Sequence, residues 1–276
     1  MKKSTKILLF FILLGIIGLL IGSFYDLQIN KLFYSRGNVY PETLKFLGEF
    51  PMIIIMTTSS LIYLRYSNFR VNKLAYILML LFFICFPIVS AYGIPRYFNS
   101  EKILLSILIY IFYISSSLIL FKFIKVEDKT KLIKFALFAA ISIFTIFIIF
   151  DFMKNIWGRH RFFDMYQKGN FSTFTNWWIL NGKPANDLFK SFPSGHTSAA
   201  ASSLVLIYIP EIFNINKKLS KFLITFPILW AVLVGISRIF DGAHFLTDIS
   251  MGYIIASSVI YILYKKLFDK YCCQIV

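Results

Sequence analysis

The sequence is poor in charged residues, and acidic residues are the scarcest of them. Charged side chains make up 15% of its 276 residues, whereas about a quarter is usual in a soluble globular domain. Hydrophobic residues make up 58%, and no polar stretch is long enough to fold a second core. The composition therefore excludes an ordinary soluble protein and predicts a single membrane domain over residues 1–276.

Cysteine is also rare, and its three occurrences form no recognisable site. Cys85 lies inside an apolar run, and Cys272 and Cys273 are adjacent near the end of the chain. Neither arrangement has the spacing of a disulfide framework or of a zinc site. We therefore expect no bound metal and no other cofactor.

The shortage of acidic residues leaves a strong excess of positive charge. The 29 Lys and Arg residues against 13 Asp and Glu give a formal net charge of +16. In a soluble protein this excess would suggest nucleic acid, but the cytoplasmic loops of membrane proteins also collect Lys and Arg. Because no basic polar domain is present, we expect membrane lipids and not nucleic acid as partners, with no obligate protein partner.

Long apolar runs are abundant, and they predict an all-α fold, a polytopic bundle of about eight transmembrane helices. The candidate spans lie near residues 7–25, 49–64, 74–94, 103–124, 132–153, 196–213, 221–238 and 246–264. No clear signal-peptide cleavage site follows the first run, so it is expected to be retained. Gly18 and Gly22 are spaced so that a neighbouring helix can approach this first span closely.

The distribution of positive charge predicts the orientation of these spans. Lys and Arg gather in clusters that fall on one side of the membrane, near residues 2–6, 65–73, 122–134, 217–221 and 265–270. Such clusters are typical of cytoplasmic loops, so both termini are expected in the cytoplasm. The segments 26–49 and 154–193 and the turn at 241–242 then lie on the outer side. An interfacial helix is expected within 26–49.

Three polar clusters fall on that outer side, each at the end of a span. They cover residues 154–161, 191–196 and 237–248. In the first, Lys154 and Arg161 are cations at the membrane edge, and a guanidinium suits bidentate contact with phosphate oxygens. Taken singly, either cation could simply extend its charge to the interface.

The other two clusters combine a helix start with histidines. Pro-Ser-Gly-His at 193–196 would place free backbone N–H groups where anions bind, although Ser194 alone would be only an N-cap. His244 and Asp248 are four residues apart, so on a helix they would share a face within hydrogen-bond reach. A carboxylate that accepts from one imidazole nitrogen leaves the other free to attack. A purely structural pair is the alternative.

All three histidines of the chain, His160, His196 and His244, occur in these clusters. Two histidines in separate positions allow one to act as nucleophile and the other as general acid. The cations would offset negative charge as it grows on a transferred phosphoryl group. His160 is interpreted as an interfacial residue.

In order and spacing the clusters resemble the signature of the type 2 phosphatidic acid phosphatase superfamily, which also includes vanadium-dependent haloperoxidases. The signature reads Lys-x6-Arg-Pro, Pro-Ser-Gly-His and Ser-Arg-x5-His-x3-Asp, and the match covers about the C-terminal half of the chain. It implies a catalytic core over residues 132–276, preceded by N-terminal helices over 1–131. It also implies phosphate hydrolysis without a metal.

The resemblance implies a role for each matching residue. His244 would attack phosphorus and form a phosphohistidine, Asp248 would orient and charge it, and His196 would protonate the leaving oxygen. The phosphoryl oxygens would be held by Lys154, Arg161, Ser194, the Gly195 backbone and Arg238. Arg159, which follows Gly158 as in similar bacterial members, is expected to be a further phosphate ligand.

Two departures from the family pattern stand out. Phe162 replaces the usual Pro after the Arg, so the loop there is expected to be less rigid. The chain also has about two spans more than integral relatives, which usually have six. An even number of extra crossings keeps the site on the outer face.

The resemblance favours hydrolysis of a lipid phosphomonoester or diphosphate at a bacterial cytoplasmic membrane. Undecaprenyl diphosphate is the favoured substrate, and phosphatidylglycerophosphate, phosphatidic acid and lipid A phosphate are alternatives. A lipid-to-lipid phosphotransferase would use the same nucleophile. A proton-coupled transporter would instead place His and Asp near mid-span, whereas the candidates here gather at one face.

Overall fold

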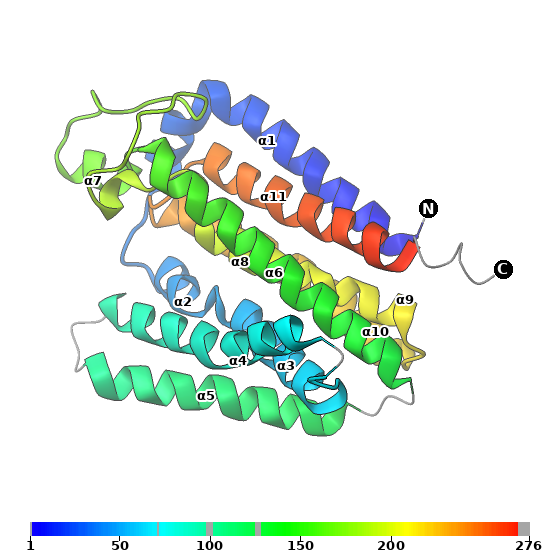
Figure 1. Ribbon diagram of the computed structural model, residues 1–276. Helices are drawn as coiled ribbons and strands as arrows, with labels where there is room; N and C mark the ends of the chain where they lie inside the picture. The colour runs from blue at the N-terminus through cyan, green and yellow to red at the C-terminus, as the bar shows by residue number, and fades with distance from the viewer. Residues whose placement is uncertain (1, 71, 98–101, 125–127, 270–276) are drawn as a thin grey trace. The chain divides into compact units, whose positions relative to one another are not determined.

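The computed structural model describes residues 2–70, 72–97, 102–124 and 128–269. Within these ranges the chain is helical and contains no strand (Figure 1). Cys272, Cys273 and parts of the basic clusters at 122–134 and 265–270 lie outside the described residues. The all-α fold expected from the apolar runs is confirmed.

Seven helical segments of the described chain are long and apolar enough to cross a membrane. They are formed by α1 (Lys3–Phe33), α2 (Val39–Leu47) with α3 (Phe50–Tyr66), α4 (Lys73–Gly93), α5 (Lys102–Phe123), α6 (Lys129–Trp157) with α7 (Phe162–Gln167), α10 (Lys217–Phe240) and α11 (Leu246–Tyr264). The chain is thus a multi-pass membrane protein. A separate short helix, α2, does form within the segment 26–49.

The predicted span at 196–213 is helical, but it is not one continuous α-helix. It consists of α8 (Gly195–Ser202), a 3-10 segment η3 (Ser203–Tyr208) and α9 (Ile209–Ile212). The hydroxyls of two consecutive serines, at 202 and 203, donate to main-chain carbonyls three residues earlier. Such bonds compete with the regular helical pattern and bend a helix, which accounts for the interruption.

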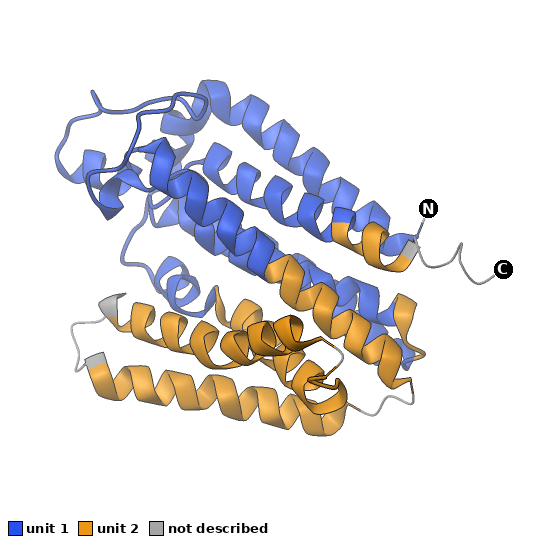
Figure 2. Ribbon diagram, viewed as in Figure 1, with its two compact units in different colours: residues 1–48, 144–210, 215–262 blue, residues 49–143, 211–214, 263–276 orange. Residues whose placement is uncertain are grey.

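The chain divides into two compact units (Figure 2). Unit 1 comprises residues 1–48, 144–210 and 215–262, and unit 2 comprises residues 49–143, 211–214 and 263–276. The helices α1 and α2 therefore belong to the unit that carries the three polar clusters. This grouping follows the packing between helices and not their order along the chain, and the expected division at residue 131 stays a prediction.

Glycines on one face of α1 explain why α1 joins this unit. A Cβ atom added at Gly15 would lie 2.6 Å from Ile254 Cγ1, one at Gly18 would overlap Ser250 Oγ, and one at Gly22 would lie 2.6 Å from Thr247 Cγ2. Glycine thus lets α1 approach α11 closely, as the spacing of Gly18 and Gly22 predicted. The order of the contacts makes the two helices antiparallel, so the end of α1 lies beside the start of α11.

Unit 2 contains α3, α4, α5 and the first half of α6. Its interior is mainly apolar, with Ile62, Leu132 and Ala136 in one buried cluster. The hydroxyls of Ser90 and Tyr113, which are both buried, share a hydrogen bond of 3.1 Å. All the predicted site residues lie in unit 1, so unit 2 supplies none of them.

Candidate active site

His244 lies in the short turn between α10 and α11, and its position is fixed from two sides. Gly242 makes this turn with a φ of 66°, a conformation that favours glycine. Asn30 of α1 donates its side-chain amide to the His244 carbonyl at 3.1 Å. Ring atom Nδ1 of His244 lies 2.6 Å from the carbonyl oxygen of Ser191. Because a carbonyl oxygen only accepts, Nδ1 carries the proton and Nε2 keeps its lone pair.

The His244 ring is buried and uncharged at neutral pH. Burial, together with the positive charges of Lys154 and Arg161, lowers the pKa of its imidazole from 6.5 to about 3, although Asp248 acts in the opposite direction. A neutral imidazole with a free Nε2 lone pair is the form that can act as a nucleophile.

Asp248 does not meet His244 in the way that their spacing predicts. Its Oδ2 lies 3.7 Å from His244 Nδ1, which is longer than a hydrogen bond. The helix α11 begins only at Leu246, so His244 precedes it and the helical four-residue geometry does not apply. Asp248 Oδ2 accepts instead from the Ser191 hydroxyl at 2.5 Å and from the Phe245 N–H at 2.8 Å. Ser191 thus links Asp248 to His244 through its hydroxyl and its carbonyl.

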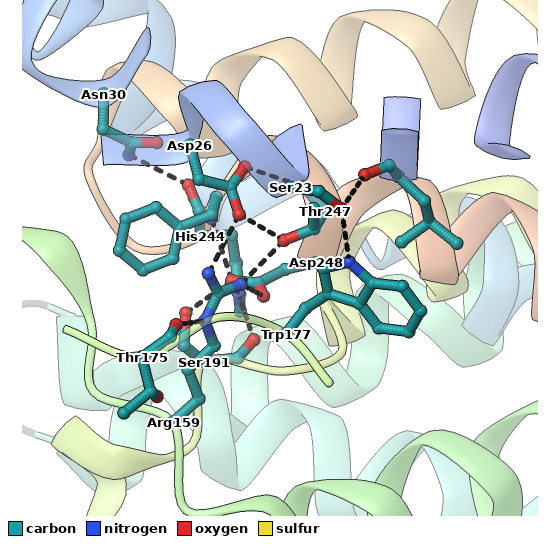
Figure 3. Close-up of polar contacts among 12 residues, drawn as sticks. Ser23, Asp26, Asn30, Arg159, Thr175, Trp177, Ser191, His244, Thr247 and Asp248 are labelled. Atoms are coloured by element: carbon teal, nitrogen blue, oxygen red, sulfur yellow. Dashed lines mark hydrogen bonds and ion pairs between the residues drawn. The ribbon is translucent and has the colours of Figure 1, made fainter. Parts of the chain in front are cut away.

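Arg159 has a different place from the one expected of a phosphate ligand. It is fully buried, and Figure 3 shows its guanidinium between two carboxylates. It donates to Asp26 at 2.9 Å, to Asp248 at 2.5 Å and to Thr247 Oγ1 at 2.7 Å, while its Nε donates to the Thr175 carbonyl at 3.0 Å. Nε, Nη1 and Nη2 are therefore all engaged within the protein.

Lys154 lies against Gly195 at the start of α8. A Cβ atom at Gly195 would lie 3.0 Å from Lys154 Nζ, so the ammonium group lies directly against the Gly195 backbone. Ser194 is the N-cap, because its Oγ accepts from the Thr197 N–H at 3.3 Å. The first N–H groups of this helix thus lie beside a cation, an arrangement that suits an anion.

His196 and Arg238 both contact the main chain of α2. His196 Nε2 lies 3.2 Å from the Lys45 carbonyl oxygen, and Arg238 Nη2 donates to the Pro41 carbonyl at 2.6 Å. Arg238 is buried, and its Nη1 lies 3.5 Å from Asp241 Oδ2. Two carbonyls of α2 therefore help to place the expected general acid and one expected phosphate ligand.

The residues expected from the sequence come together in unit 1. The ionisation of His196 is influenced by the positive charges of Arg238, Lys154 and Arg161 and by His244, which all lie near it. The Ser194 N–H donates to the Asp248 carbonyl at 3.0 Å, which joins the start of α8 to the start of α11. Among the described residues, no three His, Cys, Asp or Glu side chains are grouped so that they could hold a metal ion.

The loop after α6 is well packed. His160 bonds to Asp164 through Nε2 at 2.6 Å and to Thr173 through Nδ1 at 2.7 Å, so it braces the loop from within. Phe162 begins α7 and is buried in a cluster with Phe245. The aromatic ring therefore packs where the family pattern has a proline ring, and the lower rigidity expected of this loop stays a prediction.

Sequence reasoning missed Asp26, Thr247, the relay through Ser191 and the carbonyls of α2. For Asp26 a signal was available, because it is the only acidic residue of α1. A carboxylate inside an apolar span is costly and requires a buried partner. Nothing in the sequence identified Arg159 as that partner.

Comparison with known proteins matches the PAP2 superfamily to residues 131–272. Over 100 residues, 33% of this chain and 31% of the relative, the chain is 35% identical to lipid phosphate phosphatase 1 of Arabidopsis thaliana. It is 33% identical over 131 residues to probable lipid phosphate phosphatase 4 of the same plant, which covers 43% of this chain and 42% of the relative.

A third relative is probable diacylglycerol pyrophosphate phosphatase 1 of Schizosaccharomyces pombe, 32% identical over 92 residues, which are 31% of this chain and 33% of the relative. The chain thus spans less than half the length of each of these relatives. No solved structure matches it significantly.

Proposed function

The chain belongs to the PAP2 superfamily, and from this we propose that it is an integral membrane lipid phosphatase with His244 as its nucleophile. The observation that carries the proposal is the buried, neutral His244 ring, which has its Nδ1 proton held by Ser191 and lies near the charges of Lys154 and Arg161. The names of the relatives, which refer to lipid phosphate and to a lipid pyrophosphate, support the same substrate class.

The reaction proceeds in two displacements at phosphorus. In the first, the Nε2 lone pair of His244 bonds to phosphorus, the bond from phosphorus to the lipid oxygen breaks, and His196 gives its proton to that oxygen. In the second, water gives a proton back to His196 and attacks phosphorus, and the phosphorus–nitrogen bond breaks to release inorganic phosphate. Lys154, Arg161 and the backbone at Gly195 stabilise the negative charge on the phosphoryl oxygens in both steps.

Undecaprenyl diphosphate is the substrate we favour, with phosphatidylglycerophosphate, phosphatidic acid and lipid A phosphate as the next candidates. The pyrophosphate named in the yeast relative supports a diphosphate, and the resemblance to bacterial members supports a polyprenyl chain. From the basic clusters we propose that both termini lie in the cytoplasm of a bacterium, with the site on the outer face of its cytoplasmic membrane.

The test uses the purified full chain in detergent micelles with these four lipids. Inorganic phosphate should be released from at least one of them, and His244→Ala should abolish release. His196→Ala should lower the rate by about 10²–10⁴-fold, the usual contribution of a general acid. With radioactively labelled substrate, an alkaline quench should retain phosphate on the wild type and not on His244→Ala, because phosphohistidine is stable in alkali.

His160→Gln is the matched control, since His160 is the third histidine and its ring bonds to Asp164 and Thr173. Normal phosphate release by His244→Ala, or strong inhibition by a chelator, would contradict the proposed mechanism. Transfer of the label to a second lipid without release of phosphate would identify a phosphotransferase that uses the same nucleophile.

A further inference from the structure

Asp26 is a buried carboxylate that the family signature does not include. It lies near the end of α1, is 2% exposed and is the only acidic residue of that helix. It also lies outside residues 131–272, where the PAP2 match is found. A buried charge of this kind is retained only where partners compensate it.

All the partners of Asp26 belong to the candidate active site. Its Oδ2 accepts from Arg159 Nη2 at 2.9 Å and from the Thr247 hydroxyl, and its Oδ1 accepts from the Thr247 N–H at 3.1 Å. Thr247 immediately precedes Asp248 in the chain. The carboxylate of α1 therefore holds both the residue next to Asp248 and the guanidinium that pairs with Asp248 (Figure 3).

The guanidinium of Arg159 connects the two carboxylates. Its Nη2 donates to Asp26, while its Nη1 donates to Asp248 Oδ1 at 2.5 Å. Its Cζ atom lies 4.2 Å from the centre of the Phe245 ring, a cation–π contact. A planar fork with separate nitrogens can hold two carboxylates at once, which an ammonium group cannot do with the same geometry.

Asp248 is connected to His244 through Ser191. Asp248 Oδ2 accepts from the Ser191 hydroxyl, and the Ser191 carbonyl accepts from His244 Nδ1. We propose that Asp26 and Arg159 are positioning residues of this site, which act on His244 through Asp248 and Ser191. This inference rests on the proposed role of His244 as nucleophile.

The charges of Asp26, Arg159 and Asp248 explain how these contacts would change the rate of the reaction. Two carboxylates and one guanidinium leave one net negative charge beside His244. As His244 bonds to phosphorus its ring becomes positive, and that negative charge stabilises it. Asn at position 26 would remove the net charge and leave Arg159 to act on Asp248 alone.

The test compares Asp26→Asn and Arg159→Lys with wild type, and Asp151→Asn is the control because Asp151 is an exposed carboxylate on α6. With dioctanoyl phosphatidic acid, or whichever panel lipid is turned over, each of the two variants should lower kcat about 10–100-fold, as expected for a group behind a reacting residue. KM should change less than about threefold. Asp26→Glu, which retains the charge, should recover part of the loss.

A second measurement separates positioning from simple support of the fold. In an Asp248→Asn background the hydrogen-bonded path to His244 is cut, so Asp26→Asn should lower kcat by a smaller factor than it does in the wild type, and only the loss of its charge should count. A purely structural role would produce the same loss in both backgrounds, together with a lower melting temperature. If Asp26→Asn does not fold, Thr247→Val tests the same contacts, because it removes the hydroxyl that donates to Asp26 and accepts from Arg159. The expected loss is about 5–30-fold for two hydrogen bonds.

Orthovanadate, which adopts the geometry of phosphate during transfer, distinguishes the two proposals. Its affinity should fall about tenfold or more in Asp26→Asn, as measured by tryptophan fluorescence. A wild type that neither binds orthovanadate nor releases phosphate from any panel lipid would overturn the proposed function. An active wild type whose kcat and orthovanadate affinity are unchanged by Asp26→Asn and Arg159→Lys would overturn the positioning role alone.

Discussion

The proton on the His244 ring is held by a main-chain carbonyl. Sequence patterns identify side chains, so the spacing of His244 and Asp248 suggested a direct pair. In the structure Ser191 lies between them, with its carbonyl on Nδ1 and its hydroxyl on the carboxylate. The tautomer needed for attack by Nε2 therefore does not require Asp248 to touch the ring. In the proposed mechanism Asp248 contributes charge and orients Ser191 through the Ser191 hydroxyl.

The low pKa of His244 predicts that the stability of the folded protein falls at acidic pH. The pKa of its imidazole is about 3 in the folded protein against an ordinary value of 6.5, so between these values the unfolded chain binds a proton that the folded chain does not. The stability from this group is present above about pH 6.5 and is lost as pH falls toward 3, by at most about 1.4 kcal/mol per pH unit. The fall in melting temperature between about pH 7 and pH 4 in detergent should be smaller for His244→Asn. An equal fall in both proteins would assign the acid sensitivity to other groups.

The helices α1 and α2 take part in the candidate site, although the family signature includes no residue of either helix. The face of α1 that carries glycines brings Asp26 and Asn30 to the start of α11, where they contact Thr247 and the His244 carbonyl. The carbonyls of α2 contact His196 and Arg238. Both helices precede the matched region and still take part in the arrangement of its residues.

The packing of α1 gives a prediction at the scale of the helix. A Cβ atom at Gly15 would lie 2.8 Å from the Ser250 carbonyl oxygen, and a backbone atom cannot turn aside. Gly15→Ala should therefore destabilise the protein by about 1–3 kcal/mol, although Ala is the better helix former. Gly93→Ala is the control, because a Cβ atom there meets nothing within 4 Å. The melting temperature in detergent should fall only for the first, and no difference between them would contradict this close approach.

In the molecule as a whole, the candidate site lies where the ends of several helices of unit 1 meet. In unit 1 the end of α1, the end of α10 and the start of α11 come together (Figure 1). The candidate site residues lie toward this end, and the basic clusters around Lys6, Lys218 and Lys266 lie at the other ends of these helices. A lipid phosphate with its headgroup at the membrane surface would meet the site from there.

The orientation proposed for the molecule can be tested with single cysteines in a variant in which Cys85, Cys272 and Cys273 are replaced by Ser. A membrane-impermeant maleimide added to intact cells should label Asn170→Cys, in an exposed position of the loop after α7. It should label Lys218→Cys, in a basic cluster, only after the membrane is opened, because such clusters stay in the cytoplasm. The reverse pattern would place the site on the cytoplasmic face.

The sequence by itself determined the apolar spans, the close approach to α1 at Gly18 and Gly22, and the motifs of the three polar clusters. These features are local or periodic, because the length of an apolar run, the spacing along a helix and the order of a signature depend on near neighbours in the chain. The interruption of the segment at 196–213 was less visible, since it depends on how two serine hydroxyls bond once they are buried.

Only the tertiary structure decided which partner each buried polar group has. Arg159 could equally have faced a phosphate until α1 placed Asp26 beside it, and Ser191 became a link only when His244 and Asp248 came to lie on either side of it. A buried charge takes the nearest compensating group, and which group is nearest depends on the packing of helices that are far apart in the sequence.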